Sequence, residues 1–111
     1  MKIILSLLIL LFSFSCAKSN YPKGTPSCIE DKIVELKKND DNSAFVYRYE
    51  NHGEKVYLIS PGCCDMFTEL YDEECNYICA PSGGFTGKGD GKCKNLDLQN
   101  EVLIWKPEDN L

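Results

Sequence analysis

Five of the seven cysteines lie in one segment of the chain, between Cys63 and Cys93. The same segment holds five of the eight glycines, all between Gly83 and Gly91. A chain of 111 residues buries only a modest apolar core, so this many cysteines predict a small domain stabilised by disulfides. The length is typical of one such domain and no more.

The N-terminus has the pattern of a secretory signal peptide. A lysine at position 2 precedes an apolar run from Ile3 to Phe14, and Ser15 provides a small residue before Cys16. About 12 apolar residues are too few for a transmembrane helix, which needs about 20. We therefore expect residues 1–15 to be a signal peptide.

The residues around Cys16 resemble a bacterial lipoprotein signal. The sequence SFSC places a small residue before the cysteine, and the resemblance implies cleavage after Ser15 and lipid attachment to Cys16. Ser13 and Phe14 depart from the usual pattern. The cysteine count also favours the lipid, because removing Cys16 from seven leaves an even set of six. The alternative is an ordinary cleaved signal that leaves Cys16 as a free thiol.

The charge of the remaining chain limits its partners. Cleavage after residue 15 would leave 96 residues with 11 basic and 17 acidic side chains. Because this chain is acidic, we expect it not to bind nucleic acid. It also lacks a basic patch that would hold it on anionic lipid, so we expect membrane attachment through the lipid on Cys16. Residues 16–26 are polar with two prolines and predict a flexible tether. Residues 27–107 would form the domain and residues 108–111 a tail.

Apolar spacing predicts a helix at the start of the domain, over residues 27–38. Ile29, Ile33 and Leu36 recur at i, i+4 and i+7, which places them on one helical face. Ser27 and Glu30 have the spacing of a capping box.

Alternating β-forming residues follow the helix and predict short strands. Residues 51–54 predict a hairpin turn, in which His52 would be a solvated turn residue. The expected fold class is α+β, with one N-terminal helix packed on a small antiparallel sheet of about four or five strands and held by disulfides. The predicted strands are residues 44–50, 55–60, 70–71, 77–79 and 101–106.

Six cysteines remain for disulfides if the first carries a lipid, and the sequence cannot choose among their pairings. A bridge between neighbours strains the peptide that joins them. We therefore expect one of Cys63 and Cys64 to pair with Cys28 and the other to pair within the hairpin or the glycine loop. Zinc is a weaker alternative, because no CxxC pair and no nearby histidine accompany Cys75 and Cys79. A thiol oxidoreductase is a weaker alternative still, because the adjacent cysteines do not form a CxxC pair. The disulfide candidates are Cys28, Cys63, Cys64, Cys75, Cys79 and Cys93.

Residues 80–92 predict a tight loop anchored by Cys79 and Cys93, because glycines permit turns with positive φ. A phosphate cradle would need a Gly-Lys-Ser/Thr ending, which this segment lacks. A calcium loop would need several carboxylates, and here Asp90 stands alone. The tripeptide KGD matches a short integrin-binding motif, although any tripeptide recurs by chance. A plain ion pair across the loop, between Lys88 and Asp90, is the simpler expectation. The candidate partner-binding residues are Phe85, Thr86, Lys88 and Asp90.

The segment CCDMFTELYDEECNYICAPSGGFTGKGDGKC, with VYRYENHGEKVYLI before it and LIWK after it, resembles a family of uncharacterised small cysteine-rich bacterial lipoproteins. The resemblance covers Cys28 to Lys106 and implies a shared domain and a lipoprotein context, but no activity. It also implies variable turn residues at Cys75, which argues against a disulfide role for this cysteine.

We expect a lipid-anchored protein of the bacterial cell envelope, in the outer membrane rather than the inner, that acts as a non-catalytic binding or structural module without cofactor or metal. A secreted inhibitor or receptor-binding protein that presents residues 80–92 is the first alternative. An enzyme is the second, with Asp65, Asp72 and Asp90 as available carboxylates.

Overall fold

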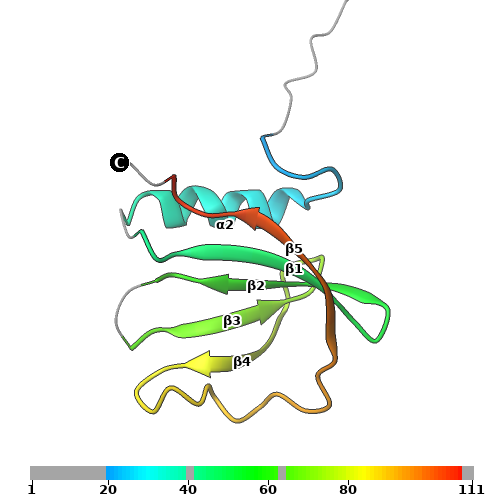
Figure 1. Ribbon diagram of the computed structural model, residues 1–111, viewed down its shortest axis with the longest axis vertical. Coiled ribbons are helices and arrows are strands. Elements are labelled where there is room, and N and C mark those ends of the chain that lie inside the picture. The colour runs from blue at the N-terminus through cyan, green and yellow to red at the C-terminus, as the bar shows by residue number, and fades with distance from the viewer. Residues whose placement is uncertain (1–19, 40–41, 63–64, 109–111) are drawn as a thin grey trace, which may run out of the picture.

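A computed structural model describes residues 20–39, 42–62 and 65–108. In these residues one helix precedes five strands, which form an antiparallel sheet in the order β4-β3-β2-β1-β5 (Figure 1). This confirms the predicted α+β fold. No helix of the described residues combines the length and hydropathy of a membrane span. The elements are α2 (Ser27–Lys37), β1 (Phe45–Asn51), β2 (Glu54–Ser60), β3 (Phe67–Tyr71), β4 (Tyr77–Gly83) and β5 (Leu98–Trp105).

Helix α2 packs on one face of the sheet through the apolar residues that the helical spacing predicted. Ile29 and Ile33 are fully buried, and Leu36 is nearly so. Full burial of one such side chain stabilises a fold by about 1.5–3 kcal/mol, so this face has an ordinary apolar core. The buried residues of this cluster are Ile29, Ile33, Leu36, Val46, Tyr57, Ile59 and Ile104.

The connection between β4 and β5, residues 84–97, covers part of the opposite face. Side chains alternate along β2, so Tyr57 lies on the helix side and Val56 on the other. In Figure 1 the connection runs beyond β4, at the end of the sheet away from α2, and then returns to β5. The buried residues here are Val56, Leu70 and Cys79, with Tyr49, Leu58, Cys93, Leu96 and Leu98 packed against them.

The start of α2 differs from the predicted capping box. Ser27 is already helical, Pro26 occupies the N-cap position, and no side chain caps the helix. The Pro26 carbonyl accepts hydrogen bonds from the N–H groups of Ile29 and Glu30 at 3.0 and 3.1 Å. The capping box is therefore wrong, and the fixed φ of proline sets the direction in which the chain begins the helix.

Residues 21–26, assigned to the tether from their composition, fold against α2. Tyr21 packs against the helix-side core, and its hydroxyl lies 3.1 Å from the Lys37 ammonium. The Thr25 hydroxyl donates to the Pro22 carbonyl at 2.7 Å and closes a turn. The ordered domain therefore begins several residues before the helix.

The predicted hairpin turn between β1 and β2 is confirmed. Two residues, His52 and Gly53, form it with φ values of 50° and 83°. Positive φ at both positions is typical of the type I′ turn, which matches the twist of antiparallel strands. Strand β4 is longer than predicted, because residues 80–83 continue it instead of beginning the loop.

Candidate functional site

Four of the predicted disulfide cysteines form two bridges. Cys28 pairs with Cys75 and Cys79 with Cys93. The expected bridge from Cys28 to one of the adjacent cysteines is therefore wrong, and so is the argument against Cys75. The acidic turn after β3 brings Cys75 beside the first turn of α2, a proximity that no spacing in the sequence reports. Cys63 and Cys64 lie outside the described residues.

Backbone hydrogen bonds hold the beginning of the 84–97 connection against β4. The Gly89 N–H donates to the Gly83 carbonyl at 3.0 Å, and the Asp90 N–H donates to the Ala80 carbonyl at 3.0 Å. A side chain at Gly89 would place its Cβ 2.0 Å from the Ala80 oxygen, in a backbone conformation of φ 78°. Glycine at position 89 therefore permits this close approach, and the approach covers part of the free edge of β4.

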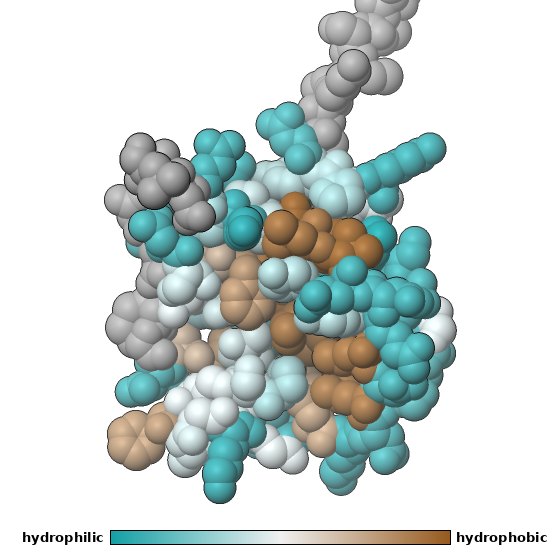
Figure 2. Space-filling model, viewed as in Figure 1, coloured by the Kyte–Doolittle hydropathy of each residue, from teal (hydrophilic) through white to brown (hydrophobic). Residues whose placement is uncertain are grey.

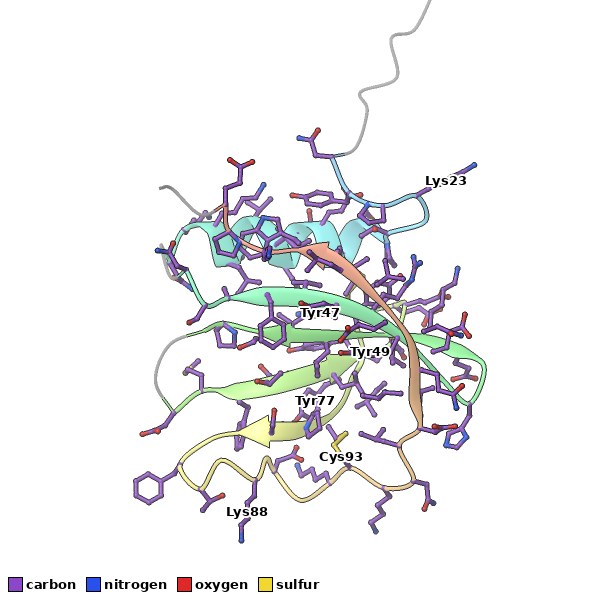
Figure 3. All side chains as sticks on the ribbon, viewed as in Figure 1. Lys23, Tyr47, Tyr49, Tyr77, Lys88 and Cys93 are labelled. Atoms are coloured by element: carbon purple, nitrogen blue, oxygen red, sulfur yellow. A yellow bond between two sulfur atoms is a disulfide. The ribbon has the colours of Figure 1, made fainter. Side chains whose placement is uncertain are left out.

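The carboxylate of Asp90 also joins the loop to β4. It accepts hydrogen bonds from the Tyr77 hydroxyl and from the Lys92 N–H. The bond from Tyr77 lowers the pKa of Asp90 and raises the pKa of Tyr77 to about 12. Figure 3 shows Cys93 between β4 and the connection, with Lys88 directed away from the sheet. Asp90 thus pairs with Tyr77, and not with Lys88 as expected.

The far end of the connection is tied to the β1–β2 turn. The Asp97 N–H donates to the Asn51 side-chain oxygen at 2.9 Å, and the imidazole of His52 contacts the Asn95 carbonyl. His52 lies in the turn and is exposed, as predicted, and its ring also contacts the Asn95 carbonyl. The connection is therefore fixed at both ends and by a disulfide between them.

The tip of this connection exposes an aromatic side chain. Phe85 is 92% exposed, although the backbone around it is held in place. The Gly84 N–H donates to the Met66 carbonyl at 3.2 Å, and the Phe67 ring lies where a Gly84 side chain would be. Met66 and Phe67 are themselves 58% and 40% exposed. We define the tip as Met66, Phe67 and Phe85.

The structure does not bring the four predicted loop residues together as one site. Phe85, Thr86 and Lys88 are exposed at or near the tip. The carboxylate of Asp90 instead accepts a hydrogen bond from Tyr77. Sequence reasoning missed Met66 and Phe67, which lie almost twenty residues earlier in the chain. Their place beside the tip depends on the pairing of β3 with the end of β4.

A cleft of about 390 Å³ lies at the opposite ends of the strands, between the β1–β2 and β3–β4 turns. Its one aspartate, Asp72, accepts a hydrogen bond from the Asn76 N–H within its own turn, and this bond lowers the pKa of the carboxyl. Asp65, at the other end of β3, is separated from Asp72 by the whole strand. Within the described residues no group of three His, Cys, Asp or Glu side chains could hold a metal ion. The cleft is lined by Gly53, Glu54, Lys55, Asp72, Glu73 and Glu74.

Residues 32–107 match the domain of unknown function DUF6970. The chain belongs to this family. The match covers all five strands, both turns and the whole 84–97 connection, and it begins inside α2. No curated protein and no solved structure matches the chain. The tip lies within the matched residues.

Proposed function

We propose that the protein is a lipid-anchored binding module of the bacterial cell envelope, which contacts its partner through the tip and acts without catalysis. The observation that carries the proposal is Phe85, an aromatic side chain 92% exposed on a backbone held by hydrogen bonds and a disulfide. Together with the exposed Met66 and Phe67 it forms an apolar patch of the kind that marks interaction sites, and interfaces use such aromatic anchors as energetic centres.

The bracing of the loop supports a binding role. Ordering a flexible loop on binding costs free energy, and a loop that is already ordered avoids most of that cost. The Cys79–Cys93 bridge and the contacts of Gly89 and Asp90 provide this order before any partner arrives. The tip is therefore presented as a fixed shape.

The position of the tip suits an anchored protein. The described chain begins at Asn20, beside α2, and the connection that bears Phe85 lies beyond β4 at the other end of the sheet (Figure 1). An anchor at Cys16 would leave the tip pointing away from the membrane. Two disulfides also support an oxidising compartment outside the cytoplasm.

The anchor is tested by labelling cells that express the full chain with a radioactive fatty acid. We expect the wild-type protein to be labelled and to sediment with membranes, and Cys16→Ala to lose both properties. A wild-type protein without label, or equal labelling of the variant, contradicts the anchor.

The contact role of the tip is tested in the same cells by placing a photo-crosslinking phenylalanine analogue at Phe85. Val34, 48% exposed on α2, is the matched control position. We expect one discrete adduct from position 85 and none from position 34. Equal yields from both positions, or no adduct from position 85, contradict the proposal.

A secreted inhibitor is a second candidate, favoured by the disulfide that closes the loop between Cys79 and Cys93. Protease–inhibitor pairs are among the tightest complexes of their size, and a loop that is ordered in advance avoids the free-energy cost of ordering on binding. The purified protein at stoichiometric concentration would then inhibit a member of a panel of serine and cysteine proteases, and replacing residues 85–90 with a Gly/Ser linker would abolish the inhibition. No inhibition across the panel excludes this candidate.

A further inference from the structure

The two outer strands of the sheet, β4 and β5, differ at their free edges. The 84–97 connection covers part of the edge of β4, through hydrogen bonds to the Ala80 and Gly83 carbonyls. Strand β5 pairs with β1 along one side. Within residues 20–39, 42–62 and 65–108, no backbone hydrogen bond from another segment reaches its other side. The outer N–H and C=O groups of β5 are therefore available to a further strand.

The second half of this open edge is apolar. Residues 102–105 are Val-Leu-Ile-Trp, a run without charge and with a high preference for strand structure. Leu103 is 40% exposed, and Figure 2 shows apolar residues gathered at the surface over β5. A long apolar edge strand is a template for pairing with another chain. Strand β5 is thus suited to contact through its side chains as well as its backbone.

The features that usually protect a sheet edge lie at the two ends of this run and not within it. Asn100 has a φ of 55°, and the register between β1 and β5 shifts beside it. Pro107 has no N–H group to donate. Glu101 and Lys106 are exposed and place one charge of each sign at the ends of the run. The Tyr49 hydroxyl donates to Glu101 and holds that carboxylate in place. The edge open to pairing is therefore residues 101–105, with Lys106 beside it.

The chemistry of this edge specifies what can cover it. Unpaired backbone groups along a strand are satisfied by an extended backbone, which adds a strand to the sheet. Leu103 lies opposite Tyr47 on the face away from α2, and Ile104 packs in the helix-side core. An added strand directs its side chains alternately to the same two faces, so apolar side chains suit both. The charges at the two ends favour a basic residue opposite Glu101 and an acidic residue opposite Lys106.

We infer that β5 binds an extended segment of a partner protein, which pairs with residues 101–105 as a sixth strand of the sheet. The segment is apolar between one acidic and one basic end. This inference goes beyond the proposed role of the tip, because β1 and β2 separate β5 from β3 and β4, which bear the tip (Figure 1). A partner on β5 therefore leaves the tip accessible.

The inference is tested on the full ¹⁵N-labelled chain in detergent, with the synthetic peptide EVTVTK as the probe at up to millimolar concentration. Antiparallel pairing places its glutamate opposite Lys106 and its lysine opposite Glu101. We expect amide exchange to slow at alternate residues of 101–105 when the peptide binds. Of two peptides N-methylated at alternate residues, the one whose methyl groups face β5 should lose binding, and the other should keep it. Equal binding by both, or unchanged exchange, overturns the inference.

Two lysine substitutions on the outer strands provide a matched comparison. Leu103→Lys places a charge on the open edge and should weaken peptide binding by roughly 10-fold, which corresponds to about 1.4 kcal/mol. Ile78, 38% exposed on β4, is the control position, and Ile78→Lys should leave binding unchanged. Equal binding by wild type and Leu103→Lys overturns the inference. Mass mapping of the two disulfides checks that each variant is folded.

The charged ends of the segment are tested by a change of preference. The wild-type protein should bind EVTVTK more tightly than KVTVTK by roughly 3-fold, the size of one exposed ion pair. Lys106→Glu should reverse this preference, because both ends of the edge are then acidic. A preference that does not change overturns the inference.

The state of the edge before any peptide is added distinguishes other occupants. We expect the same alternate amides of 101–105 to exchange rapidly, and the protein to sediment as a monomer. Slow exchange in a monomer would assign the edge to a segment of the same chain. Slow exchange in a dimer that Leu103→Lys dissociates would assign it to a second copy. Either result overturns the inference and leaves the proposed role of the tip standing.

Discussion

The two faces of the sheet are stabilised by different means. The helix face buries seven residues, including three from α2, and closes them with ordinary side-chain packing. The other face buries three residues under a connection that contributes few apolar side chains of its own. Figure 2 shows apolar residues gathered over β5 and the residues that lead into it, with polar residues around them.

The comparison separates the scaffold from the presented surface. Periodic apolar residues and the Cys28–Cys75 bridge together hold α2, whereas the connection depends on a disulfide, on backbone hydrogen bonds and on a glycine at position 89. Stability on the helix face is therefore spread over many contacts, and order on the other face rests on a few. Four changes test this difference.

Removal of the two disulfides should give the largest effects, and they should differ in extent. Cys28→Ser with Cys75→Ser opens a loop with a sequence separation of 47 and should lower the free energy of unfolding by about 4 kcal/mol. Cys79→Ser with Cys93→Ser opens a separation of 14 and should cost about 3 kcal/mol. Guanidinium denaturation measures both. Hydrogen exchange should show α2 still protected in the second variant only, and loss of α2 protection there would contradict the separation of the two faces.

Substitution of two loop glycines should distinguish close packing from backbone strain. Gly89 and Gly87 have nearly equal φ values of 78° and 75°, but only an alanine at position 89 meets the Ala80 carbonyl. Gly87→Ala should cost about 1–2 kcal/mol through its backbone conformation alone. Gly89→Ala should cost a further 1–3 kcal/mol, roughly, because the strand and loop must separate. Equal melting temperatures for the two variants would show that the approach at position 89 is dispensable.

A buried hydroxyl offers a change that should not destabilise the helix face. Tyr57 is fully buried, and in the described part of the chain its hydroxyl has no hydrogen-bond partner. Burial raises the pKa of Tyr57, partly offset by the nearby Arg48. Tyr57→Phe should leave the free energy of unfolding equal or raise it by up to about 1 kcal/mol. The control, Tyr49→Phe, removes a hydroxyl that donates to Glu101 and should lower it by about 1 kcal/mol. Destabilisation by Tyr57→Phe would reveal a partner for the hydroxyl.

The smallest expected effect depends on pH and concerns the bond between Tyr77 and Asp90. The folded pKa of Asp90 lies below its ordinary value of 3.8, so its stabilisation is present above that value and is lost as the pH falls through the lowered pKa. The pKa of Tyr77 rises from 10.0 to about 12, so its contribution is lost as the pH rises through that range. Tyr77→Phe should lower the melting temperature slightly at neutral pH and not at all at either extreme. A difference that persists in strong acid would contradict this assignment.

Local patterns were enough to predict the scaffold. The spacing of Ile29, Ile33 and Leu36 predicted the helix, and Asn51 to Glu54 predicted the first hairpin turn, because both signals lie within a few residues. Strand β4 was predicted too short, since Pro81, Ser82 and Gly83 show no alternation of apolar and polar residues. Its last residues are strand because β3 and the loop pair with them.

The candidate site was only partly predictable, because it is made by contacts between distant segments. The glycines predicted the loop, and Phe85 was among its predicted contact residues. Met66, however, joins the tip only through the pairing of β3 with β4. The partner of Cys28 could not be deduced for the same reason. Asp90 looked like a surface charge, and its bond to Tyr77 spans 13 residues.

The connectivity of the bridge between Cys28 and Cys75 has a consequence for biogenesis. A chain that crosses a membrane N-terminus first delivers Cys63 and Cys64 to the oxidising side before Cys75. An oxidase that joins thiols in their order of arrival would therefore trap Cys28 with a wrong partner, and thiol–disulfide exchange would have to correct it. Cys79 and Cys93 arrive one after the other and need no such correction. If the protein is exported as proposed, the yield of native protein should thus depend on a disulfide isomerase for the Cys28–Cys75 bridge alone.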